Sequence, residues 1–209
     1  MRRNVLSRIV AAISGVVLFG ALASTTADAA YIVAFEEVGP NVEAVGGGSL
    51  NIAALELFDM TSDSAFVFAQ EATEITGVAT LTPIDIYEGL ISGPLSLGPG
   101  GSSSFGATSG LGDLVGVFGS PFSLIVPRSY VSGALLSDES VYANQSFASL
   151  GLTPNVYVYT WGSGATADSL TIVIGDVPEP STWALTLLGF AGLGYAGHRA
   201  SRKGAAAMA

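Results

Sequence analysis

The chain has 209 residues with a formal net charge of −10, and only 11% of its residues are charged, against about 25% in an average globular protein. It contains no cysteine, which excludes disulfides, thiolate nucleophiles and cysteine-ligated zinc. Residues 30–177 hold 15 acidic residues and one cation, Arg128, a local charge of −14, which excludes nucleic acid as a partner because phosphate binding needs clustered cations.

The N-terminal segment has the three parts of a secretory signal peptide. Met-Arg-Arg is followed by an apolar run over residues 9–23 and by a stretch of small residues that ends in Ala-Asp-Ala-Ala. We predict a signal helix in residues 1–29, cleaved between Ala29 and Ala30. The alternative is an uncleaved membrane anchor, but about 15 apolar residues fall short of the roughly 20 that a spanning helix needs.

Residues 30–176 show the period-two alternation of β-strands. The clearest runs are residues 31–38, 155–161 and 168–174, and shorter runs follow the rest of the segment (42–45, 49–57, 65–69, 84–88, 114–118, 123–126 and 129–136). Short strands with Gly and Pro between them predict an exported all-β domain, an antiparallel β-sandwich of the jelly-roll-like or Greek key kind. We expect one helical turn at residues 146–150, capped by Ser146 and ended by Gly151, and a long exposed loop at the glycine-rich residues 98–112.

The composition of this domain removes most catalytic chemistries. The single histidine is His198, and residues 30–177 contain neither lysine nor cysteine. Ser-His-Asp triads, Cys-His pairs, histidine-ligated metals and Ser-Lys dyads are therefore excluded. A pair of carboxylates acting on a glycosidic bond remains open, with candidates at Glu36, Glu37, Glu56, Asp59, Glu71, Glu74, Asp85 and Glu88, although most such charges are solvated surface groups.

Two binding hypotheses remain beside the enzymatic one. No cofactor is expected, but a structural calcium ion could be held by the clusters Asp59–Asp63 or Asp138–Glu139, since calcium prefers oxygen ligands; the alternative is that these charges serve solubility. The aromatic row Tyr157, Tyr159 and Trp161 could contact a glycan if its face is open, whereas such a row more often packs against a second sheet.

The C-terminal segment has a polar leader, an apolar run and a basic end. Val-Pro-Glu-Pro-Ser-Thr precedes residues 183–197, which begin with Trp183 and end with Gly197, and the cations Arg199, Arg202 and Lys203 follow. The 16 residues from Thr182 would span about 24 Å as a helix, a short but workable transmembrane length. Cations after the helix predict a cytoplasmic tail and an exterior domain. A final stretch, residues 204–209, is expected to be disordered.

This segment closely resembles the PEP-CTERM sorting signal of exported proteins in exopolysaccharide-producing Gram-negative bacteria. Pro178, Glu179 and Pro180, the apolar helix and the basic cluster occur in the order of that signal, over residues 177–203. The resemblance implies recognition by an exosortase, a membrane transpeptidase that removes the tail. It assigns Pro178–Pro180 to recognition and Arg199, Arg202 and Lys203 to the stop signal.

These observations together predict an exosortase substrate that is not an enzyme. We expect it to be anchored in the inner membrane before processing and then to reach the cell surface or the extracellular matrix, in a structural or adhesive role linked to exopolysaccharide and biofilm. The alternatives are a carbohydrate-binding or surface-binding module, including an ice-binding-like one, and a carboxylate-dependent glycan hydrolase.

Overall fold

The computed structural model describes residues 30–100 and 103–175. These residues form thirteen strands, one short α-helix and two single 3-10 turns. The strands are arranged in two sheets, so the prediction of an all-β fold is confirmed. None of the helices in the described ranges is long and apolar enough to cross a membrane. The predicted signal helix and transmembrane helix lie outside the described residues.

Sheet A contains six strands and carries both ends of the described chain. Its order is β12 (Asn155–Trp161), β13 (Asp168–Ile174), β1 (Ala30–Val38), β2 (Asn41–Ser49), β11 (Leu135–Tyr142) and β8 (Ser109–Gly112). β1 runs parallel to β13 and antiparallel to β2. The expectation of a purely antiparallel sandwich was therefore wrong for this pair, because the first and last strands, which no hairpin connects, lie side by side.

Sheet B contains seven strands. Their order is β3 (Glu56–Asp63), β6 (Thr82–Glu88), β10 (Phe122–Pro127), β9 (Val115–Gly119), β5 (Thr73–Thr76), β4 (Phe66–Phe68) and β7 (Phe105–Gly106). The hairpin of β9 and β10 lies between β5 and β6, although these two strands are consecutive in the sequence. Strand β3 pairs with β6 alone within the described sheet and forms its edge.

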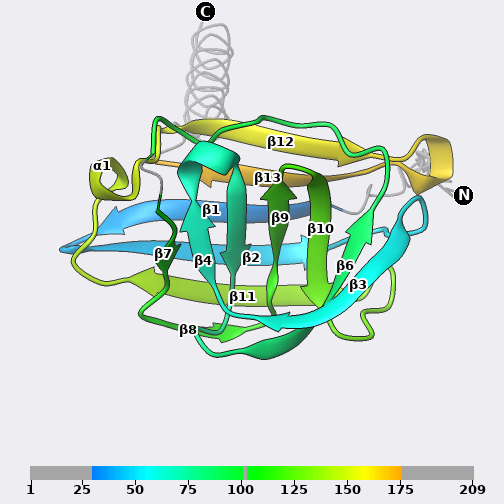
Figure 1. The fold of residues 1–209 in the computed structure, drawn as a ribbon, viewed down its shortest axis with the longest axis horizontal. Helices are drawn as coiled ribbons and strands as arrows, with labels where there is room; N and C mark the ends of the chain where they lie inside the picture. The colour runs from blue at the N-terminus through cyan, green and yellow to red at the C-terminus, as the bar shows by residue number, and fades with distance from the viewer. Residues whose placement is uncertain (1–29, 101–102, 176–209) are drawn as a thin grey trace, which may run out of the picture.

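The two sheets pack face to face, and in Figure 1 the strands of sheet B cross in front of those of sheet A. Alternate residues of each strand enter the space between the sheets: in β13, Leu170, Ile172 and Ile174 are buried while the residues between them are half-buried. They join one large apolar core with residues of sheet B such as Val117 and Leu124. The period-two pattern in the sequence thus indicates which face of each strand is buried between the sheets.

The helical turn α1 (Phe147–Leu150) lies where the sequence predicts it. The Ser146 hydroxyl accepts a hydrogen bond from the Ser149 N–H, and Gly151 ends the helix in the left-handed conformation, at φ 71°. Glycine adopts this conformation without the steric cost that other residues bear.

Some predicted boundaries were wrong. Residues 98–112 are not one loop, because β7 and β8 occupy part of them. Residues 50–55 lie between β2 and β3 rather than in a strand, and residues 129–134 form turns before β11. Strands β3 and β5 were not predicted. Both alternate weakly in sequence: β3 is exposed along nearly its whole length and β5 is buried on both faces.

The parallel pairing of β1 and β13 places the two ends of the domain far apart. Ala30, which opens β1, pairs with Ser169 near the start of β13, and Phe35 pairs with Ile174 at its end. The Gly175 N–H then donates to the Phe35 carbonyl at 2.9 Å. The chain therefore enters sheet A at one end and leaves it at the other.

Candidate functional site

A pocket of about 620 Å³ opens at the end of sheet B where β3 begins and β6 ends. Pockets of about 300–1,000 Å³ are the usual size of small-molecule sites. The wall is made by the start of β3, the segment after β6 and the turn between β9 and β10 (Ala54, Glu56, Leu57, Phe58, Glu88, Gly89, Leu90, Ile91, Pro121 and Phe122).

Two glutamates supply the charge of this pocket. Glu56 opens β3 and Glu88 closes β6, and antiparallel pairing sets them directly opposite one another. Glu56 is exposed and Glu88 is half-buried. On the next strand the buried Ser123 donates its hydroxyl to Glu88 Oε1 at 3.4 Å. The sheet register, rather than any loop, thus brings the two carboxylates to one place.

Large apolar side chains form much of the remaining wall. Phe58 and Leu90 are 66% and 94% exposed. Phe58 is the extra residue where the register between β3 and β6 shifts, and bulges of this kind redirect side chains at sheet edges. On the opposite side Phe122 packs edge-on against Tyr159, with ring centroids 6.1 Å apart. One wall of the pocket is therefore fixed to the core while the other is presented to solvent.

A second polar cluster lies inside the sandwich, away from this pocket. Glu74 of β5 is fully buried, and neither of its carboxylate oxygens has a hydrogen-bond partner. Asp138 of β11 is buried nearby and accepts a hydrogen bond from the Tyr31 hydroxyl. The hydroxyl of Tyr142, also buried, has no partner. Buried polar groups are normally paired, so this cluster carries a free-energy cost.

Burial controls the ionisation of the cluster. It raises the pKa of Glu74 well above the ordinary value, and the charge of Asp138 raises it further. Burial also raises the pKa of Asp138 to about 6, although the hydrogen bond from Tyr31 opposes the shift. The pKa values of the Tyr31 and Tyr142 hydroxyls are raised mainly by burial. The interior of the sandwich therefore favours the protonated forms of Glu74 and Asp138.

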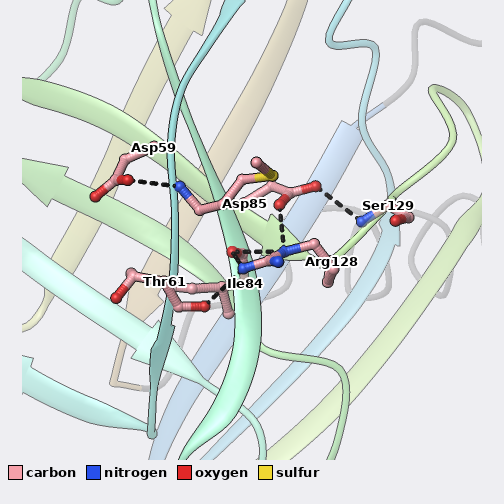
Figure 2. A network of polar contacts seen from close by, with 7 residues as sticks. Asp59, Thr61, Ile84, Asp85, Arg128 and Ser129 are labelled. Atoms are coloured by element: carbon pink, nitrogen blue, oxygen red, sulfur yellow. Dashed lines mark hydrogen bonds and ion pairs between the residues drawn. The ribbon is translucent and has the colours of Figure 1, made fainter.

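A third polar network joins β3, β6 and the residues that follow β10 in sheet B (Figure 2). Arg128 Nε lies 2.6 Å from Asp85 Oδ1, and the Ser129 N–H donates to Asp85 Oδ2 at 2.8 Å. The guanidinium also donates to the carbonyls of Ile84 and Thr61, each at 3.0 Å from Nη2. Arg128 thus neutralises a buried carboxylate and ties the edge strand β3 to β6.

The aromatic row predicted for glycan contact is closed. Tyr157, Tyr159 and Trp161 are 9%, 0% and 3% exposed and belong to the core between the sheets. Their polar atoms bond to the main chain: Tyr157 to Leu97 and Thr153, Tyr159 to Ala72, and Trp161 to Asn51. The condition for sugar stacking, an open face, is not met, because this side of β12 packs against sheet B.

The eight carboxylates considered for acid–base chemistry lie in different places. Glu56 and Glu88 meet in the pocket, whereas Glu74 and Asp85 are buried in separate networks. The proposed calcium clusters do not gather further acidic ligands: no group of three or more His, Cys, Asp or Glu side chains with metal-site geometry occurs in the ranges described. Sequence reasoning missed the interior pair of Glu74 and Asp138, since nothing in the local pattern of β5 distinguishes an inward glutamate from an outward one.

The sorting residues lie outside the described ranges. These are Ala29 of the predicted cleavage site, the motif Pro178, Glu179 and Pro180, the apolar segment from Trp183, and the cations Arg199, Arg202 and Lys203. Ala30, the predicted first residue of the mature chain, is the first residue of β1. Gly175 is the last residue that the structure describes, and the sorting segment follows it in the sequence.

Comparison with known families confirms the resemblance at the C-terminus. Residues 176–203 match the family described as the PEP-CTERM protein-sorting motif. No curated protein and no solved structure matches the chain. The motif implies export, passage through a membrane-anchored stage and processing by an exosortase toward the surface.

Proposed function

We propose that this chain, which carries a PEP-CTERM protein-sorting motif, is an adhesive or structural protein of the cell surface or extracellular matrix. One observation carries the proposal: the described β-sandwich extends to Gly175, and the match to the sorting motif begins at the next residue. Exosortase processing would release this domain outside the cell, where an exopolysaccharide matrix is its expected surroundings. Its strongly acidic surface keeps such a domain soluble there.

Sorting is tested by the mass of the protein in cells with and without the exosortase. We expect the C-terminal tail to be lost only when the enzyme is present, and Glu179→Ala to retain it, because that substitution alters the recognition element. An equivalent change elsewhere in the chain, Glu36→Ala, is the matched control and should be processed normally. An intact tail in both strains, or a tail lost in both, would contradict the proposal.

The role we propose is not enzymatic. Glu56 and Glu88 are the two carboxylates of the described residues that line the open pocket, so a catalytic role is tested on them. Incubating the protein with extracellular polysaccharide should release no new reducing ends over a long incubation. Release that disappears in Glu88→Gln would replace this role with that of a glycan hydrolase.

A further inference from the structure

We propose that the pocket formed by β3, β6 and the β9–β10 turn binds an amino sugar through its unsubstituted, positively charged amine. This inference adds a ligand to the adhesive role and does not depend on sorting. It rests on the charge, the wall chemistry and the size of the pocket.

The negative charge of the two pocket glutamates favours a positively charged ligand. Glu56 and Glu88 lie directly opposite one another across β3 and β6, and like charges in that position destabilise a sheet. None of the ten residues that form the pocket is a lysine, arginine or histidine. The one cation of the described residues, Arg128, is already bound to Asp85. An ammonium group between the two glutamates would relieve their repulsion.

The wall chemistry favours an organic cation over a metal ion. Calcium takes 6–8 oxygen ligands, and the two glutamates are the only side chains of the pocket that carry oxygen. The other eight residues are Ala, Gly, Leu, Ile, Phe and Pro. A ligand that fills the pocket must therefore present carbon surface beside its charge.

The size and shape of the wall favour a ring. A volume of about 620 Å³ is far more than one ammonium group occupies. Phe58 and Leu90 offer flat and branched apolar surface that is exposed in the free protein, and an aromatic ring also attracts a nearby cation. A sugar ring presents C–H groups on one face, while its amine can reach the carboxylates. The open mouth admits a ring that belongs to a longer polymer.

A second pair of glutamates lies opposite one another on neighbouring strands but does not line this pocket, and this pair provides a control. Glu36 and Glu43 are also directly opposite one another, on the outer face of β1 and β2. Neither forms part of the pocket wall. A polycation attracted only by the net negative charge would respond to both pairs alike.

The test is titration of the full chain in detergent with glucosamine oligomers at pH 6, with N-acetylated oligomers as the neutral match. We expect the glucosamine oligomers to bind and the N-acetylated oligomers not to bind. Glu56→Gln or Glu88→Gln should weaken it about tenfold and Phe58→Ala about fivefold, while Glu36→Gln should change it less than about twofold.

Folding of the variants is checked by thermal melting without ligand, where removing one charge of the opposed pair should leave the midpoint unchanged or raised. Equal binding of polylysine and glucosamine oligomers, or equal losses in Glu36→Gln and Glu88→Gln, would reduce the effect to general charge attraction and overturn the proposal. Equal binding of the N-acetylated oligomers would overturn the role of the amine. None of these results would bear on exosortase processing.

Discussion

Replacing Arg128 with methionine is expected to lower the free energy of unfolding by about 3 kcal/mol. The substitution removes the ion pair with Asp85 and the hydrogen bonds to the carbonyls of Ile84 and Thr61. Asp85, whose side chain is 6% exposed, would keep a buried charge without its cation. Because 37% of the Arg128 side chain is exposed, solvent screens part of the attraction, and we take the low end of the range for broken buried pairs. Urea denaturation monitored by tryptophan fluorescence gives the value.

A double-mutant cycle separates the buried charge from lost packing. Asp85→Asn keeps an acceptor for the Ser129 N–H and removes the charge, so the pair Asp85→Asn with Arg128→Met should be more stable than Arg128→Met alone. If the two single losses simply add, the charge of Asp85 is not what makes the loss of Arg128 costly. The second variant thus tests the cause even where the first is poorly folded.

The domain should lose stability as the pH rises from about 4 to 8, with about 2 kcal/mol of the loss from Asp138 alone. In the folded state the Asp138 pKa is raised from 3.8 to about 6, and the Glu74 pKa is raised well above 4.5. The folded state therefore holds protons that the unfolded chain releases. Stability is complete below the unfolded pKa values and is lost as the pH rises through the folded ones. Denaturant midpoints measured at one-unit intervals check this slope.

Glu74→Gln should flatten this dependence and stabilise the protein at pH 8 by about 1–3 kcal/mol, because an uncharged amide replaces a buried, unpartnered carboxyl group whose ionisation burial opposes. The matched control is Glu71→Gln, an exposed glutamate in the 3-10 turn just before β5, which should leave the curve unchanged. Parallel curves for the wild-type protein and Glu74→Gln would show that Glu74 does not carry the effect.

The local sequence pattern was sufficient to predict the elements whose two faces differ clearly in hydrophobicity. Strands β12 and β13 occupy the predicted residues 155–161 and 168–174, and the turn capped by Ser146 and ended by Gly151 is present. In each case the side chains that form the alternation or the cap lie within a few residues of one another. The local sequence is therefore enough to predict the element. The sorting motif is of the same kind, since its parts are contiguous.

What could not be predicted depends on contacts between distant segments. The pairing of β1 with β13 joins residues more than a hundred positions apart. The row of Tyr157, Tyr159 and Trp161 alternates as predicted, but only the position of sheet B determines that its face is closed. Likewise Glu56 and Glu88 were named among eight separate carboxylates, and the register of β3 on β6 makes them a pair.

The arrangement of β1 beside β13 also determines how the domain would resist a mechanical load. Within the described residues, the chain enters sheet A at Ala30 and leaves it after Ile174, at the opposite end of the paired strands. A force that pulls these two points apart slides two parallel strands past one another, so the hydrogen bonds along six paired positions, Ala30 with Ser169 through Phe35 with Ile174, bear it together rather than in turn. A domain attached at both of these points would therefore be loaded in shear along β1 and β13.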